Sequence, residues 1–261
     1  ETLRRMTSYA NYHVLVADNG SSDGTLEYLE SQSWVTLLRN GTNLGFVRGN
    51  NAALRTLPAD HDVILLNNDT EILHADWIEQ LQKSAYQAED VGVVGCRLVN
   101  PDGLLMHTGT YIMPETWWGQ QIGGGEQDCN QYAIDRDVEG VVFACVYLKR
   151  QVLDEVGLLD EDFFSYFEDT DYCLRARGRG YRTVCCGGAT VMHHQNVSTA
   201  INGVSHNAMF KTSMETFRGK WEGYFNNVND GRYQHQLDWH SLINLPSGYA
   251  ISSRRLIETL E

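Results

Sequence analysis

The sequence predicts an α/β fold, a mostly parallel sheet with helices on both faces, on the strength of three observations. Short apolar segments alternate with helical ones, which is the pattern of repeated β-turn-α units. The apolar segments are continuous and not alternating, as in strands buried on both faces. Polar clusters follow the strands or lie in their connecting loops, at 18–25, 43–51 and 67–71. Because ligands of such sheets bind at the carboxyl ends of strands, these clusters are expected to converge on one crevice.

Residues 1–100 account for the first four strands, which are expected at 12–17, 34–38, 62–66 and 91–95. Helices are expected over 1–10, 25–30, 49–54 and 76–88, and residues 43–46 are expected to form a loop. The helix at 76–88 carries Trp77, Leu81 and Ala85 on one face. This spacing predicts that the helix packs its apolar face against the sheet.

The pattern loosens after residue 100. Residues 111–137 contain Trp117, Trp118 and three consecutive glycines without any period, which predicts a long loop or hairpin of the kind that is often functional. One or two strands are expected over 138–149, and further strands at 181–184 and 189–192. Helices are expected over 150–156, 169–177 and 209–225, with a polar loop after the last.

Composition and charge exclude several classes of protein. The chain has 261 residues, of which 34 are acidic and 20 basic, and its formal charge is −14. This excess of acids argues against a nucleic-acid partner, and a phosphorylated small ligand would need a metal ion or backbone N–H groups. No window approaches ~18 uncharged apolar residues, so no transmembrane segment is expected. Six cysteines without a C-x-x-C pair predict buried free thiols and a cytoplasmic location.

The cluster Asn67-Asn68-Asp69 directly follows the apolar strand at 62–66. A carboxylate at that place points into the ligand crevice, and carboxylate and amide oxygens are hard ligands that suit Mg²⁺ or Mn²⁺. Such an ion can bridge two phosphates. The same residue types also form turns and helix caps, so the cluster alone leaves both interpretations open.

A second cluster places Glu168, Asp169 and Asp171 at the start of a helix. A structural interpretation is available, because acids favour a helix N-terminus and Asp171 can pair with Arg175 at i+4. The functional interpretation is that one carboxylate is a general base, since neighbouring acids raise one another's pKa. All three acids are expected to line the same crevice as Asp69.

Two further side chains stand at strand ends. His193 follows an apolar strand, and a neutral imidazole near Asp69 would complete a metal site, although a histidine pair is often structural. Asp18 ends the first strand, where its carboxylate can accept the N3–H of uracil or thymine. The turn after Asp18 can equally be no more than a helix cap.

Four motifs occur in order: DNGSSDGT at 18–25, NLGFVRGNN at 43–51, LLNNDTE at 65–71 and FFSYFEDTDYCLRAR at 163–177. Together they resemble the family 2 glycosyltransferases of the GT-A fold, a Rossmann-like architecture, and most of all the rhamnosyltransferase-like branch. The resemblance covers about residues 3–200. It also implies that the first strand of the family is missing from this chain, which would begin inside the first helix.

The resemblance implies roles for individual residues. Asp18, Asn43 and Gly45 would bind the nucleotide. The run Asn67-Asn68-Asp69 is similar to the Asp-x-Asp motif of the family with its first acid replaced, and it would also contact the donor. Asp69 and His193 would hold Mn²⁺ or Mg²⁺.

On the other side of the site, the resemblance identifies Asp169 as the catalytic base. Trp117 or Trp118 would stack on a sugar of the acceptor, although plain packing is an equal alternative for both. Glu168 would belong to the acceptor side as well.

The activity implied by the resemblance is that of an inverting, non-processive glycosyltransferase in polysaccharide biosynthesis. It would transfer a sugar from a UDP- or dTDP-sugar to a hydroxyl of a glycan or lipid-linked saccharide, without a membrane span and at most peripherally at a membrane. The segment 217–221 lacks the Gln of processive members. The alternative is a catalytically degenerate nucleotide-sugar-binding domain of a larger glycan-assembly protein, because Asn67 leaves fewer charges for the metal.

The same resemblance implies a domain organisation. Residues 1–225 would form the GT-A domain, with a nucleotide-binding half at about 1–100 and an acceptor-side half at about 101–225. Residues 226–261 would be an extension or linker. Because 245–261 resembles the opening turn and first helix of a GT-B glycosyltransferase, a downstream glycosyltransferase domain is expected.

Overall fold

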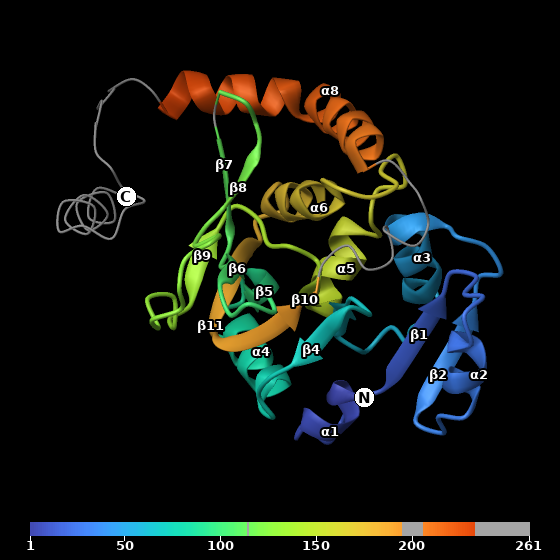
Figure 1. The fold of residues 1–261 in the computed structure, drawn as a ribbon. Helices are drawn as coiled ribbons and strands as arrows, with labels where there is room; N and C mark the ends of the chain where they lie inside the picture. Colours follow the sequence, from blue (N-terminus) through green and yellow to red (C-terminus); the bar gives the residue numbers. More distant parts are fainter. Residues whose placement is uncertain (114, 195–205, 233–261) are drawn as a thin grey trace. The chain divides into compact units, whose positions relative to one another are not determined.

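The computed structural model describes residues 1–113, 115–194 and 206–232, and it confirms the α/β fold class (Figure 1). The chain separates into two compact units, Glu1–Trp221 and Glu222–Glu261. The first unit contains every residue assigned to the predicted site. The predicted boundary after residue 225 falls inside the last helix and stays a prediction, and residues 245–261 lie outside the described part.

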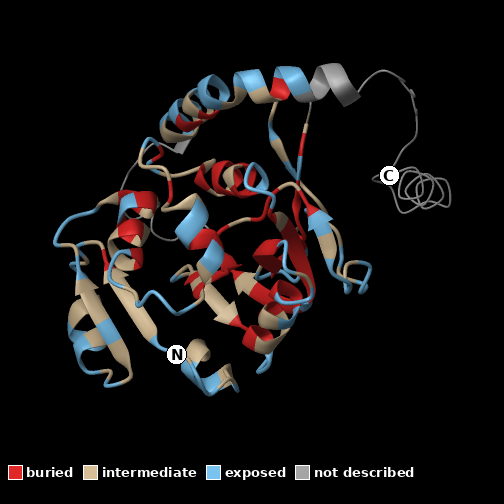
Figure 2. Ribbon diagram, turned by 180° about the vertical axis from the view of Figure 1, so that it is seen from behind, coloured by how far each residue is buried: buried red, intermediate tan, exposed pale blue. Residues whose placement is uncertain are grey.

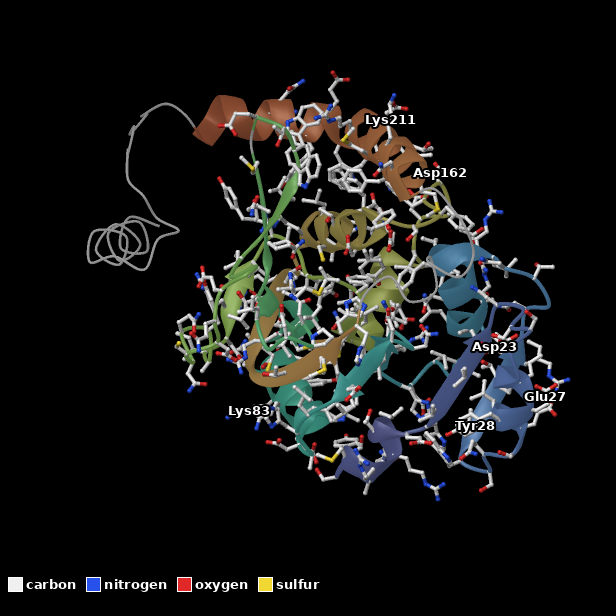
Figure 3. The ribbon with its side chains drawn as sticks, in the orientation of Figure 1. Asp23, Glu27, Tyr28, Lys83, Asp162 and Lys211 are labelled. Carbon is white, nitrogen blue, oxygen red and sulfur yellow. The ribbon has the colours of Figure 1, made fainter. Side chains whose placement is uncertain are left out.

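The N-terminal elements are α1 (Thr2–Met6), β1 (Val14–Asp18), α2 (Thr25–Glu30), β2 (Val35–Arg39) and α3 (Gly45–Leu54). Strands β1 and β2 pair in parallel, with Asp18 opposite Arg39. In the described ranges they form a sheet of their own and do not extend the larger one, unlike the single sheet expected from the pattern. Figure 3 labels Asp23, in the turn before α2, and Glu27 and Tyr28 on α2, and all three residues are exposed.

The central sheet has the order β3 (Val63–Leu66), β10 (Cys145–Leu148), β5 (Val91–Val99), β11 (Arg182–His193) and β4 (Thr70–Ile72). Strands β6 (Leu105–His107) and β9 (Arg136–Val138) pair with β5 and β11. Because β10 is antiparallel to both β3 and β5, and β5 is parallel to β11, the long apolar strands β3, β5 and β11 all run in one direction. The antiparallel members come mostly from the second half, where the sequence pattern loosens.

Helices cover the central sheet on both faces. The helix α4 (Trp77–Ala85) buries Trp77, Leu81 and Ala85 in the core, as its spacing predicts. The helices α5 (Arg150–Val156) and α6 (Glu168–Arg177) lie on the other side of the sheet (Figure 1). Figure 2 shows the buried residues concentrated in this central part, whereas β1 and β2 are only half-buried. Of the predicted site residues, Asp18 therefore lies at the end of a lightly packed strand, β1, and His193 at the end of a densely packed one, β11.

Three elements of the second half refine the sequence-based expectations. The segment after residue 110 forms a hairpin of β7 (Thr110–Ile112) and β8 (Gly119–Gln121). The two strands expected between 181 and 192 are one strand, β11, with an irregularity between Cys186 and Thr190. The helix α8 (His206–Arg232) is longer than predicted and replaces part of the expected polar loop. No helix in the described ranges is long and apolar enough to cross a membrane.

Candidate active site

The turn after β1 is built around the carboxylate of Asp18. This buried side chain accepts hydrogen bonds from the N–H groups of Gly20, at 2.9 Å, and Ser21, at 3.2 Å. Burial alone would raise the pKa of Asp18, but the bonds from Ser21 and Gly20 outweigh it and lower the pKa. A carboxylate has about four lone-pair sites, so Asp18 keeps acceptor capacity for a donor group such as N3–H.

Asn19 joins the Asp18 turn to the loop before α3. Its Nδ2 donates to the carbonyl oxygen of Gly45 at 3.0 Å, and its Oδ1 accepts from Nδ2 of Asn40 at 2.8 Å. Asn43 Oδ1 accepts the N–H of Gly45 at 2.9 Å, so the helix begins at Gly45, earlier than the composition predicts. Sequence reasoning did not single out Asn19. One indication in the sequence was Gly49, a glycine inside a helical segment, which often marks a close contact. In the structure, a Cβ at Gly49 would come within 2.8 Å of the Asn19 amide.

The strands β4 and β11 bring Asp69 and His193 together, as the sequence predicts. The two strands are antiparallel, with Thr70 opposite His193, and this register places His193 Nε2 3.1 Å from Asp69 Oδ1. Both side chains are largely buried, 13% exposed for Asp69 and 10% for His193. Burial alone would raise the pKa of Asp69, but the hydrogen bond and the charge of His193 lower it. Asp69 is therefore held as an anion.

The Asp69–His193 pair has the chemistry of a divalent metal site, because a carboxylate oxygen and an imidazole nitrogen converge within 3.1 Å. In the part of the chain that the structure describes, no third His, Cys, Asp or Glu completes a cluster. An ion held by these two side chains would take its remaining ligands from water or from donor phosphates. Asn67 is half-buried and Asn68 exposed, and the hydrogen bond of the pair joins His193 to Asp69 without a side chain of either asparagine.

Glu168 and Asp169 open α6 in a very different environment. Asp169 accepts hydrogen bonds from the N–H of Thr170 at 2.6 Å and from its hydroxyl at 3.2 Å, yet burial keeps its pKa raised. Glu168 is 7% exposed, and its buried Oε2 has no hydrogen-bond partner among the described residues. Burial first, and then repulsion by Asp169 and Asp171, raise the pKa of Glu168 to about 8.

Asp171 does not line the crevice, in contrast to the expectation for all three acids. It is completely buried, with Oδ2 2.8 Å from Arg175 Nε, and its Oδ1 faces α8. There, Lys220 Nζ approaches to 2.7 Å and Trp221 Nε1 donates at 2.9 Å. Asp171 is thus the anchor that joins α6 to α8. Its pairing with Arg175 at i+4 was the structural alternative, whereas nothing local in the sequence points to Lys220.

The aromatic residues of the hairpin tip pack against α8 and against the segment that precedes α6. The ring of Trp118 is 47% exposed and lies 5.1 Å from that of Phe210, which in turn lies 5.2 Å from Phe167. Trp117 is half-buried and has a left-handed backbone, with φ at 57°. Of the two tryptophans, Trp118 is therefore the more exposed, and its ring packs against α8.

Short backbone links connect these parts into one site. The N–H of Asn67 donates to the carbonyl oxygen of Ala144 at 2.9 Å, and the preceding residue, Phe143, hydrogen-bonds through its backbone to Asp169. The turn that carries Asp69 and the predicted base Asp169 are thus bonded to two consecutive residues of the main chain. On the nucleotide side, the N–H of Phe46 donates to the carbonyl oxygen of Phe164, just before α6.

This α/β domain, with carboxylates at the ends of its strands and at a helix start, has the GT-A fold of glycosyltransferases. The chain belongs to the family described as "Glycosyltransferase like family 2", whose model matches residues 1–214. The match confirms the resemblance inferred from the four motifs.

Curated relatives agree with this assignment. The chain is 30% identical, over 85% of its length, to the uncharacterized protein y4gI of Sinorhizobium fredii, and 28% identical, over 78%, to the O-antigen biosynthesis protein RfbC of Myxococcus xanthus. It spans only 25% and 16% of those two proteins. It is also 28% identical, over 78% of its length, to the N-acetylglucosaminyl-diphospho-decaprenol L-rhamnosyltransferase of Mycobacterium tuberculosis, and covers 73% of it.

Solved structures show the same fold. The mannosyltransferase PcManGT of Pyrobaculum calidifontis, in complex with GDP-Man and Mn²⁺, matches 98% of this chain and 74% of its own, with a TM-score of 0.53 and 15% identity. GalNAc-T7, with UDP, GalNAc and Mn²⁺, matches 70% of this chain and 38% of its own, with a TM-score of 0.55 and 12% identity. At this level of identity the likeness concerns the fold.

Proposed function

We propose that the protein is an inverting, non-processive glycosyltransferase that moves a sugar from a UDP- or dTDP-sugar to a hydroxyl of a glycan or lipid-linked saccharide. The observation that carries the proposal is the state of Asp169. It is a partly buried carboxylate whose pKa is raised, and the described residues give it hydrogen bonds but no cationic partner. Together with the family membership, this environment supports a general base.

In the proposed reaction, Asp169 accepts the proton of the acceptor hydroxyl as that oxygen attacks the anomeric carbon. The bond from that carbon to the diphosphate oxygen breaks in the same step, so the configuration at the carbon is inverted. Burial increases the proton affinity of Asp169, and the two hydrogen bonds from Thr170 hold its carboxylate in one orientation. After transfer, the proton leaves Asp169 to solvent.

The donor would lie between the Asp18 turn and the Asp69–His193 pair. Asp18 would accept the N3–H of the pyrimidine, and the loop of Asn43 and Gly45 would border the nucleotide. Asp69 and His193 would hold Mn²⁺ or Mg²⁺. When bound, such an ion would neutralise the charge that develops on the departing nucleoside diphosphate. An ion also explains how a chain with a formal charge of −14 attracts a diphosphate.

The acceptor would lie on the hairpin side of α6. The exposed face of Trp118 offers a flat apolar surface for a sugar ring, which is a common use of tryptophan at carbohydrate sites. Glu168 is adjacent to the base and can donate or accept a hydrogen bond, depending on its protonation. The family resemblance also assigns the segment after residue 195 to the acceptor side, and residues 195–205 of it lie outside the described residues.

The proposal is tested with a thermal-shift panel of UDP, dTDP, GDP and ADP, each with and without Mn²⁺. Stabilisation by UDP or dTDP in the presence of Mn²⁺ only, and its loss in Asp69→Asn, is the expected result. Release of UDP or dTDP from the corresponding sugar nucleotides then separates an enzyme from a degenerate binding domain. If wild type and Asp169→Asn release the nucleotide equally slowly while both bind it, the degenerate domain is the correct description.

A further inference from the structure

Phe164 supplies the cap of α3 from a distant part of the chain. Its carbonyl oxygen accepts the N–H groups of Phe46, at 3.2 Å, and Val47, at 3.5 Å. The first N–H groups of a helix have no acceptor within the helix, so an external carbonyl at this place decides where the helix begins. The segment that leads into α6 therefore holds the start of α3.

The ring of Phe164 lies directly against Gly45. A Cβ at Gly45 would come within 2.6 Å of Phe164 Cε2, closer than real Cβ contacts allow. Gly45 also has φ at +75°, a left-handed conformation that favours glycine. The ring is nevertheless 48% exposed, which is unusual for a phenylalanine in such close backbone contact. Phe164 therefore lies at the surface of the Asn43–Gly45 loop and not in the core.

The residues between Phe164 and Asp169 form a constrained segment. Tyr166 and Phe167 both have left-handed backbones, with φ at 71° and 66°, immediately before α6 begins at Glu168. Strained residues of this kind persist only where their surroundings enforce them. Ser213 on α8 supports the segment through a 2.7 Å hydrogen bond to the carbonyl oxygen of Ser165.

The segment between Phe164 and α6 is held so tightly that a shift of Phe164 is expected to move the start of α6 as well. The segment is bonded to α3 at Phe164 and to α8 at Ser165, and two consecutive strained residues follow. Asp169 lies in the first turn of the helix that begins directly after them. The Asn43–Gly45 loop and Asp169 are thus linked through one short, tightly held piece of chain.

We propose that Phe164 is a positioning residue, whose contact with the Asn43–Gly45 loop couples nucleotide occupancy of that loop to the placement of Asp169. The biological meaning of this coupling rests on the proposed function. The coupling itself is a mechanical property of the fold, because it needs only the contacts of Phe164. It can therefore be measured without catalysis.

Hydrogen–deuterium exchange measures the coupling in the free protein. In Phe164→Ala, the amides of 45–49 and of 163–169 are expected to exchange at least about 10-fold faster together, since the ring that fixes the capping carbonyl is gone. Phe164→Leu, which keeps part of the apolar contact, should show an intermediate effect. The control is Ile134→Ala, which removes another exposed apolar side chain. Unchanged exchange at 163–169 in Phe164→Ala overturns the proposal.

A double-mutant comparison tests the catalytic consequence. Gly45→Ala places a methyl group against the ring, so it should lower kcat for release of UDP or dTDP by about 10-fold to 100-fold, in addition to any change in KM that follows from its place beside the nucleotide. Adding Phe164→Ala removes the collision and should restore part of that loss relative to Gly45→Ala alone. Independent, multiplying effects of the two changes contradict the coupling. If the exchange data show coupling but wild type releases no nucleotide, the proposed function fails and the coupling stands.

Discussion

The carboxylates at the two ends of the candidate site have pKa values shifted in opposite directions. Asp69, beside β4, has the imidazole of His193 at 3.1 Å, and this partner lowers its pKa in spite of burial. At the start of α6, Glu168 is buried and Asp169 partly buried, and the described residues bring neither of them a cation. Burial therefore raises their pKa values.

The difference teaches that position in the fold, and not residue type, decides what an acid can do. A carboxylate with a lowered pKa stays an anion and is suited to holding a cation. A carboxylate with a raised pKa is suited to accepting a proton. The four experiments below test this division of roles, beginning with the largest expected effect.

Asp169→Asn should have the largest effect, and it should change the rate of reaction without changing nucleotide binding. Loss of a general base typically costs 10²–10⁴-fold in rate, so release of UDP or dTDP should fall by about that factor. Stabilisation by the nucleotide with Mn²⁺ should remain, because the Asp69 end is untouched. Initial rates and thermal shifts on the same preparations measure both quantities. A variant that loses nucleotide binding together with rate would contradict the separation.

Asp171→Ala tests the acid of α6 that does have cationic partners. The change leaves Arg175 and Lys220 facing a site without its anion, and breaking a buried ion pair in this way costs about 3–5 kcal/mol of unfolding free energy. Urea unfolding measures the loss, with Asp162→Ala, an exposed acid of the preceding loop, as the control. A loss no greater than that of the control would show that α8 does not depend on Asp171.

Glu168→Gln tests the raised pKa directly. Between the ordinary pKa of 4.5 and the folded value of about 8, the folded protein binds more protons at Glu168 than the unfolded chain does. Stability from this group is therefore full below pH 4.5 and is lost as the pH rises toward 8. Wild type should lose a few kcal/mol more than Glu168→Gln across this window. Parallel pH profiles of the urea midpoints would refute the assignment.

His193→Ala should weaken the other end by a smaller factor. Loss of the imidazole removes one of two protein ligands, and Mn²⁺ affinity should fall by at least about 10-fold. Titration of free Mn²⁺ by electron paramagnetic resonance measures this without turnover. His194→Ala is the matched control, since His194 pairs with Glu71 instead, at 2.8 Å. Equal losses in the two variants would remove His193 from the proposed metal site.

The parts of the fold that depend on local pattern could be predicted from the sequence. The apolar strands, the packing face of α4 and the proximity of Asp69 to His193 follow from periodicity and from strand ends. The separate β1–β2 sheet and the antiparallel β10 could not be predicted, because pairing partners leave no mark on a short apolar run.

The same distinction between local pattern and long-range contacts applies to the candidate site. The acids of α6 were identifiable as candidates, but their different environments depend on residues far along the chain. Lys220 neutralises Asp171 across 49 positions of sequence, and no local feature of 168–171 predicts which acid it selects. Phe164 was part of a motif, yet its contact with Gly45 joins the loop before α6 to the start of α3, which no local feature of either motif predicts.

The backbone link at Phe143 and Ala144 has a consequence for how the site tolerates substitution. Phe143 hydrogen-bonds to Asp169 and Ala144 to Asn67, so a single stretch of main chain ties the start of α6 to the turn that carries Asp69. Main-chain bonds survive most side-chain replacements. Substitutions at positions 143 and 144 that keep the backbone in place are therefore expected to leave this tie intact.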